Sequence, residues 1–284
     1  MKRHLRLSTI LLVIAVASLA YLYLVPLVYV LRTAFSEPSS IGFSDSAALT
    51  LASFKELATN PYYVKILGTT LIISLMVAVM TALIAYPLAL AIVLFPERIG
   101  NLLLIFVVTP MLTSSIARTF GWVVILGPTG LISSTLRTLG VAQPPQLMGT
   151  TFGISLGLAQ IYIPYATLIM SSAFGALNQN LSYAAQTLGA SKMMTFKRII
   201  LPLTANGLFS SCMLVFVLSA SAYVTPQVLG SGKVQTLATE IYDSAVVALN
   251  WPMASALAIV LIVLYAAIMI IVNVVKAHAE RIRS

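Results

Sequence analysis

The sequence predicts an all-α membrane protein with six membrane-spanning helices, and three observations support this prediction. Hydrophobic residues make up 60% of the 284 residues and charged residues only 8%, whereas a soluble domain carries about a quarter charged residues. The mean hydropathy is +1.01. The length suits about six helices of the roughly 20 residues that a bilayer requires. No room remains for a large soluble domain.

The charge balance points to a membrane rather than to nucleic acid. Sixteen basic and seven acidic residues give a net charge of +9, but the basic residues are scattered among apolar runs and form no face that could follow a phosphate backbone. We therefore expect no nucleic-acid partner. Cys212 is the only cysteine, so an intramolecular disulfide and a zinc site built on cysteines are excluded.

The first span is expected in the uncharged run from Leu7 to Leu31, which follows the basic start MKRHLR. A secretory signal peptide has a similar pattern, but its apolar core is only about 7–15 residues long. The longer run favours a retained membrane helix, kinked at Pro26. Residues 32–65 are a mixed polar stretch in which we expect a loop with a short amphipathic helix near 53–58. Residues 1–65 thus form an N-terminal helix and its loop.

The second span is expected from Ile66 to Pro96 and the third from Ile99 to Ala117. At about 1.5 Å per residue the third run is just long enough to cross a bilayer. Residues 118–146 are largely uncharged but are broken by several glycines and prolines. Irregular backbone is not tolerated where it contacts lipid. We therefore expect a surface helix and a partly buried irregular segment there.

Three further spans are expected in the second half of the chain: Met148 to Leu177, Gly207 to Val224, and Ala254 to Val275. Six spans place both termini and the polar stretch 178–206 on one side of the membrane. That side carries ten basic and two acidic residues, and the other side six basic and five acidic. Because cytoplasmic loops are enriched in basic residues, we predict that both termini and residues 178–206 face the cytoplasm.

The 178–206 segment interrupts an otherwise strongly apolar chain. Its apolar residues recur at helical spacing in two groups, one from Leu181 to Leu188 and one from Phe196 to Ile200. Gly189 lies between the groups, where a helix would end or turn, and Pro202 predicts a break further on. The pattern indicates a short helix, a turn and a second short helix at the membrane surface, available to another protein. The alternative is an ordinary linker between spans.

Catalytic motifs are absent from the sequence. Its two histidines lie in the charged tails, and neither H-E-x-x-H nor G-x-S-x-G occurs. The string Gly230-Ser231-Gly232-Lys233-Val234 approaches a phosphate loop, but Gln227 and Val234 replace the required Gly and Ser/Thr. The expected spans also contain almost no ionisable residue, unlike those of many ion-coupled carriers. If the chain transports a solute, we expect the energy to enter through the 178–206 segment.

At this segment the sequence resembles a known family. Ala184-Ala185-x-x-Leu188-Gly189-Ala190-Ser191, followed by Phe196, Ile199 and Leu201-Pro202, resembles the EAA loop of permeases of binding-protein-dependent ABC importers. The similarity covers most of the chain from about Ile66. The string from Thr113 to Trp122 and Trp251-Pro252 are similar to the subgroup that imports polyamines, opines, aminoethylphosphonate and related amines. The sequence departs from the family at Tyr183, where Glu is usual, and at Asn206, where Pro is common.

The resemblance implies a six-helix type I ABC importer permease bundle in a bacterial inner membrane, with a core permease domain at 66–284. It also implies that the 178–206 segment docks in a groove of a cytoplasmic ATPase. The residues expected to couple the two proteins are Ala184, Ala185, Leu188, Gly189, Ala190, Ser191, Phe196, Ile199 and Pro202.

The same resemblance implies the partners: a second, different permease chain, two ATP-binding subunits and a periplasmic solute-binding protein. It implies no cofactor in this chain, since ATP and magnesium would be bound by the ATPase. The cargo would be a small polar or cationic solute. Two alternatives of other classes are an ion-coupled secondary transporter and a membrane-embedded assembly factor or sensor.

Six further residues are weaker candidates for a substrate path or a binding-protein contact: Arg118, Tyr162, Tyr165, Tyr223, Glu240 and Asp243. Arg118 equally suits an interfacial anchor beside aromatic residues. Glu240 and Asp243 lie three residues apart in a possible amphipathic helix and equally suit a solvated face. Tyrosine is more often a packing or interfacial residue than part of a path.

Overall fold

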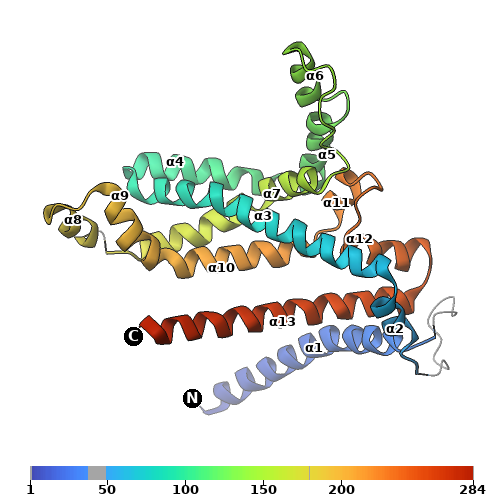
Figure 1. The fold of residues 1–284 in the computed structure, drawn as a ribbon. Helices are drawn as coiled ribbons and strands as arrows, with labels where there is room; N and C mark the ends of the chain where they lie inside the picture. Colours follow the sequence, from blue (N-terminus) through green and yellow to red (C-terminus); the bar gives the residue numbers. More distant parts are fainter. Residues whose placement is uncertain (1, 38–48, 179, 284) are drawn as a thin grey trace. The chain divides into compact units, whose positions relative to one another are not determined.

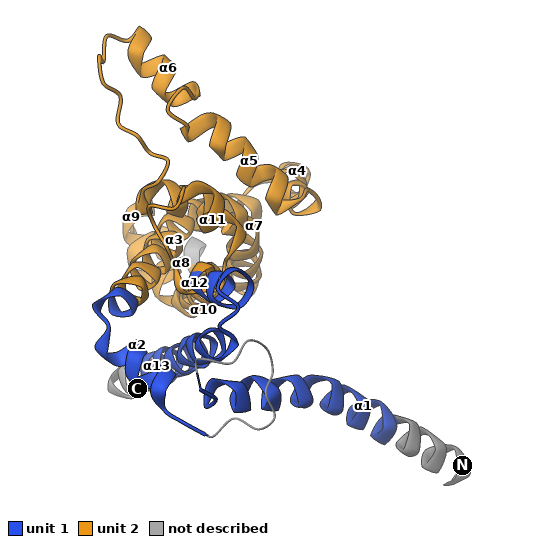
Figure 2. Cartoon of the chain, turned by 90° about the vertical axis from the view of Figure 1, so that its right-hand side faces the viewer, with its two compact units in different colours: residues 1–64, 240–284 blue, residues 65–239 orange. Residues whose placement is uncertain are grey.

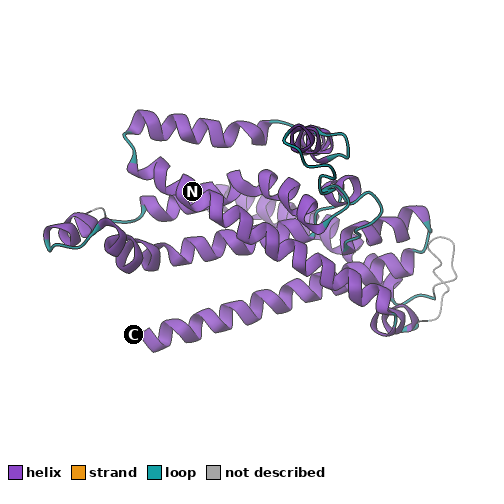
Figure 3. Ribbon diagram, turned by 45° about the horizontal axis from the view of Figure 1, so that its top comes forward, coloured by secondary structure: helices purple, strands orange, loops and turns teal. Residues whose placement is uncertain are grey.

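The computed structural model describes residues 2–37, 49–178 and 180–283. Throughout these ranges the chain forms helices and connecting loops without a strand (Figure 3). The expected loop at 32–65 lies partly at 38–48, outside the described residues, but its short helix is present as α2, Ala52–Thr59. The chain divides into two compact units, residues 1–64 with 240–284 and residues 65–239 (Figure 2).

The first unit is built on two long helices, α1 (Lys2–Ala34) and α13 (Trp251–Arg283). They pack against each other in antiparallel directions, so that Val25 to Val30 of α1 face the Trp251–Ala258 end of α13. From Leu12 to Arg32 no residue of α1 is buried, and burial begins only at Thr33 and Ala34. Pro26 lies inside α1 without ending it.

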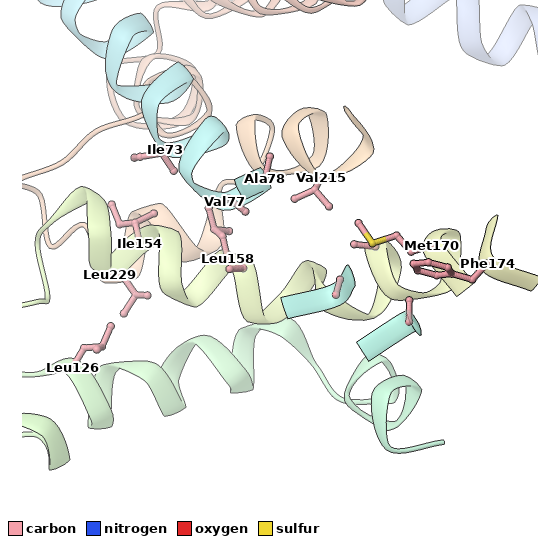
Figure 4. Close-up of a cluster of buried hydrophobic side chains, with 14 residues drawn as sticks. Ile73, Val77, Ala78, Leu126, Ile154, Leu158, Met170, Phe174, Val215 and Leu229 are labelled. Atoms are coloured by element: carbon pink, nitrogen blue, oxygen red, sulfur yellow. The ribbon is translucent and has the colours of Figure 1, made fainter. Parts of the chain in front are cut away.

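The second unit is organised around α7, Thr151–Gly175, which is the most deeply buried of the six candidate membrane-spanning segments. The unit also includes all or most of α3 (Pro61–Leu94), α4 (Glu97–Val108), α5 (Ser115–Leu126), α6 (Leu131–Thr138), α10 (Leu201–Ala220) and α11 (Val224–Leu229), and the start of α12 (Leu237–Tyr242) (Figure 1). Residues of α3, α5, α7, α10 and α11 form one hydrophobic core, labelled in Figure 4: Ile73, Val77, Ala78, Leu126, Ile154, Leu158, Met170, Phe174, Val215 and Leu229. The tightest helix pair is α7 with α10, where a Cβ on Gly207 would collide with Ala173.

Six helical segments in the described residues are long and apolar enough to cross a membrane: Leu12–Ala34, Pro61–Leu94, Ser115–Thr138, Thr151–Gly175, Lys192–Ala220 and Trp251–Val272. The number agrees with the prediction from the sequence. The bounds of two segments differ from the prediction: the third segment was expected at 99–117 and the fifth at 207–224. The second segment also begins earlier than expected, at Pro61.

The third segment begins later than expected because the helix that precedes it does not continue through residues 109–114. After α4 the chain tightens into a 3₁₀ turn, Thr109–Leu112, which contains Pro110, and Thr113 is then extended. Pro110 has no backbone N–H to donate to an α-helical hydrogen bond, and the helix ends where Thr113 becomes extended, so one straight helix does not form here. α5 starts at Ser115 and carries the apolar run onward. The predicted interruption near Gly127 and Gly130 is observed, since these residues separate α5 from α6.

Candidate functional site

The 178–206 segment forms the helix, turn and helix that its periodicity predicted. α8 is Asn180–Thr187 and ends in a left-handed residue, Gly189, with φ of +87°. Two hydrogen bonds close the turn: the Gly189 N–H donates to the Gln186 carbonyl, and the Ala190 N–H to the Ala185 carbonyl, both at 3.0 Å. This pair of bonds is the Schellman motif, which uses glycine because a side chain is strained at positive φ.

The next helix, α9 (Lys192–Thr195), starts at a capping serine. Ser191 Oγ accepts a hydrogen bond from the Met194 N–H at 3.2 Å, and Thr195 Oγ1 donates to the Ser191 carbonyl at 3.1 Å. A serine in this place satisfies a backbone N–H that the first helical turn leaves without a partner. Ala185, Gly189, Ala190 and Ser191 thus have a local structural role that fixes the angle between α8 and α9.

Pro202 does not break the chain as expected. Residues Lys192–Ala220 form one continuous helical segment, and a π-turn at Phe196–Ile200 lies just before the proline. In this turn the Leu201 N–H donates to the Phe196 carbonyl, five residues back. A proline ring collides with the carbonyl four residues before it, and the wider π-turn relieves that collision. The second short helix is therefore the first part of the fifth span.

Phe196 faces the interior of unit 2. Its ring centroid lies 6.0 Å from that of Tyr86 on α3, and Tyr86 in turn lies 5.1 Å from Phe174 on α7, both in edge-to-face arrangements. Tyr86 Oη also lies 2.9 Å from Thr204 Oγ1. This aromatic cluster attaches the 178–206 segment to the bundle. Phe196 thus anchors the loop within this chain, whereas the sequence had indicated an anchor for a partner.

The exposed residues of the segment combine apolar with basic groups. Leu188 is 88% exposed, and Ala184 is also exposed. Met193 and Met194, which the sequence analysis did not single out, are 63% and 45% exposed. Lys192, Lys197 and Arg198 are exposed as well, and residues 178–206 contain no acid. Ile199 is only partly exposed. The side chain of Tyr183 lies outside the described side chains.

The acidic candidates lie in unit 1, at the end of α12. Glu240 is 8% exposed, so it does not form part of a solvated face. Its carboxylate accepts hydrogen bonds from Tyr62 Oη at 2.8 Å and from Ser244 Oγ at 3.4 Å. Asp243 begins a π-turn, Asp243–Val247, whose Ala248 N–H donates to the Asp243 carbonyl. π-turns of this kind are frequent at functional sites.

The aromatic candidates and Arg118 lie in unit 2. Tyr162 Oη donates to the Leu218 carbonyl at 2.9 Å, which joins α7 to α10, and its ring lies 6.3 Å from that of Tyr165. Tyr223 directly precedes α11. α11 is joined to α5 through Thr119 and Thr225, whose hydroxyls lie 3.0 Å apart.

Arg118 lies in the first turn of α5, and its Nε and Nη1 atoms are buried with no hydrogen-bond partner in the structure. No group of three or more His, Cys, Asp or Glu side chains comes together in the described part of the chain.

Comparison with known proteins agrees with this architecture. Residues 78–281 match the family described as "Binding-protein-dependent transport system inner membrane component". The spermidine/putrescine transport system permease protein PotB of Haemophilus influenzae is 30% identical over 249 residues, covering 87% of this chain and 86% of that protein. The PotB of Salmonella typhimurium strain LT2 is 28% identical over 272 residues, which cover 95% of this chain and 94% of that protein.

Among solved structures, the chain is similar to one in a bacterial ABC transporter involved in the import of the acidic polysaccharide alginate. The TM-score is 0.72 at 16% identity, over 98% of this chain and 96% of that chain. A second structure of a bacterial alginate ABC transporter, in complex with a periplasmic protein that holds an alginate pentasaccharide, gives a TM-score of 0.69 at 19% identity, over 96% and 94% of the two chains. These likenesses confirm the predicted all-α importer-permease fold.

Proposed function

The chain belongs to the family of inner-membrane components of binding-protein-dependent transport systems, and from this premise we propose how it is driven and what it carries. It is the permease subunit of an importer, and its energy comes from a separate ATPase that binds the 178–206 segment. The observation that carries this proposal is the exposed apolar and basic face of α8 and α9, which is continuous with a membrane span.

The geometry suits the transmission of movement. Lys192–Ala220 is a helical segment of 29 residues, about 43 Å long at the rise of an α-helix. α8 is fixed to its start by the Gly189 turn, and Phe196 ties the same region to α3 and α7 through Tyr86. A force on α8 would therefore displace the fifth span together with its neighbours instead of being absorbed by a flexible loop.

The proposed cargo is a small polyamine-like cation. Two relatives that share over 85% of their length with this chain are named as spermidine/putrescine permeases. The buried Glu240 carboxylate, which lies outside the six candidate spans, supplies a negative charge that a cationic solute could contact. A periplasmic binding protein would deliver the cargo. One bundle of this size cannot easily enclose a path, so we propose a dimer with a second, different permease chain and two ATP-binding subunits, which bind ATP and magnesium.

The experiment uses the transporter assembled with its partners in vesicles and measures uptake together with ATP hydrolysis. In Gly189→Asp, aspartate tolerates the left-handed backbone but places a negative charge on the docking face. Ala185→Glu places a longer acidic side chain on α8, where the native residue is a small alanine. We expect uptake to fall about tenfold or more, equivalent to about 1.4 kcal/mol of lost docking free energy, while membrane insertion is retained.

Gly140→Asp is the matched control, because Gly140 also has a positive φ, +92°, with open space around its Cα, but lies outside the 178–206 segment. Normal uptake by both loop variants would contradict the proposed docking. Uptake that follows an ion gradient and persists without ATP would instead identify a secondary transporter.

A further inference from the structure

A cavity of about 380 Å³ lies between α8 and the adjacent end of the helical bundle in unit 2. Its walls come from the last turns of α3 and α7, from α8 itself, and from the helical segment that begins at Lys192. Ten of its fourteen lining residues are apolar. The volume lies within the range of about 300–1,000 Å³ found for binding pockets. α8 therefore covers a cavity and does not pack against a filled core.

The rim of this cavity is apolar and open. Leu94, Leu181 and Leu203 line it and remain 59%, 47% and 52% exposed. Leu94 and Leu203 belong to segments that are apolar enough to lie in a bilayer, and Leu181 lies on α8. Water in such a hollow would find few hydrogen-bond partners, whereas a hydrocarbon chain from the surrounding lipid would bury its apolar surface at a gain of about 0.8 kcal/mol per methylene.

The remaining lining of the cavity is polar and carries one positive charge. Lys192 is the only charged residue that lines it, and Gln186, Asn178 and Thr195 are the other polar ones. Lys197 and Arg198 follow on the same helical segment, with no acid between residues 178 and 206. Basic pockets beside membrane helices bind the headgroups of anionic lipids.

We propose that this cavity binds an anionic phospholipid, with one acyl chain between α8 and the bundle and the phosphate at Lys192. The lipid would lie directly behind the surface offered to the ATPase and against Phe196, the residue that anchors the loop. The lipid content of the membrane would then influence how firmly α8 is held. This site adds to the proposed function, but the binding itself does not depend on it.

The test uses the assembled transporter in phosphatidylcholine vesicles that contain a small fraction of phosphatidylglycerol with a photoreactive group on one acyl chain. After illumination, labelled peptides are identified by mass spectrometry, without ATP or solute, so that a failure of transport does not affect the result. We expect labelling of peptides from α8 and from residues 192–203. Val93→Trp fills the cavity and should abolish this labelling, whereas Val79→Trp, on the same helix but 52% exposed and outside the cavity, should not.

Lys192→Gln tests the contact with the lipid headgroup separately from the contact with the acyl chain. We expect it to reduce labelling about fivefold, the contribution of one basic side chain near anionic lipid, and Lys197→Gln to have no such effect, since Lys197 does not line the cavity. Because Lys192 is exposed, its loss leaves the fold intact even if Val93→Trp does not. Equal labelling in Val93→Trp and Val79→Trp would overturn the site. Equal labelling by a phosphatidylcholine probe, with no effect of Lys192→Gln, would overturn its preference for an anionic lipid.

Discussion

Gly207 and Ala173 show how one absent side chain sets the separation of two spans. A Cβ at Gly207 would collide with the Ala173 side chain, whereas a Cβ at Gly68 on α3 meets nothing within 4 Å. Small residues let membrane helices approach closely. We expect Gly207→Ala to lower the free energy of unfolding by about 1–3 kcal/mol through overpacking.

The matched variant Gly68→Ala should instead raise the free energy of unfolding, by up to about 1 kcal/mol, since alanine is the better helix former. The prediction is tested by comparing the thermal unfolding midpoints of the two purified variants in detergent. Equal midpoints would show that α7 and α10 separate at no cost.

Leu188 and Phe196 both belong to the predicted coupling residues but face different surroundings. Phe196→Ala removes a ring that packs edge-to-face against Tyr86, so we expect the isolated chain to lose about 1–3 kcal/mol of stability, less than for a fully buried ring. Leu188→Ala truncates a side chain that is 88% exposed, so the stability of the isolated chain should change by less than about 0.5 kcal/mol.

The second readout for this pair is co-purification with the ATPase subunit. We expect Leu188→Ala to weaken it, because docking would bury this exposed side chain, and burying a leucine contributes about 1.5–3 kcal/mol. A Leu188→Ala variant that retains the ATPase fully would place the docking face elsewhere on the segment.

At the scale of elements, the π-turn at Phe196–Ile200 sets the rotation of α9 relative to α10. Pro202→Ala removes the ring that favours the wider turn, so the helix can return to ordinary α-helical bonding. Because each residue of an α-helix turns the chain by about 100°, the loss of the extra residue would swing α8 away from its present direction. We expect normal or higher thermal stability together with impaired uptake by the assembled transporter.

Pro26→Ala is the control for this variant. Pro26 is an exposed proline inside α1 and has no part in the 178–206 segment, so its replacement should leave uptake unchanged. Unimpaired uptake by Pro202→Ala would mean that the direction of α8 is set by the Gly189 turn alone.

The elements also show what a sequence can predict. Gly189 was predicted as a turn because it separates two helical periodicities, and a positive φ is what glycine supplies. The continuation of the helix through Pro202 was not predictable. A π-turn is defined by a hydrogen bond to the carbonyl five residues back and has no characteristic amino-acid composition. The inward direction of Phe196 was equally hidden, since three apolar residues at helical spacing do not reveal whether they face the bundle or a partner.

For the molecule as a whole, the charge count predicts that the 178–206 segment faces the cytoplasm and the loop around Lys233 the periplasm. Cys212 is the only cysteine, so Cys212→Ser provides a background for single reporters. We expect Lys233→Cys to react with a membrane-impermeant maleimide in cells whose outer membrane is permeable. Leu188→Cys should react only after the inner membrane is opened. Both native side chains are exposed, so access depends on sidedness, and the reverse pattern would invert the proposed orientation.

The exposure of α1 has a consequence for the order in which the protein is made. From Leu12 to Arg32 no residue is buried by the rest of the chain, and the apolar segment Leu12–Ala34 reaches a mean hydropathy of 2.2. α1 is synthesised before α13, the helix on which it packs. A helix that satisfies its own backbone hydrogen bonds and carries apolar side chains is stable alone in lipid. α1 can therefore be inserted early and remain in the bilayer until its neighbour arrives, without a chaperone to cover it.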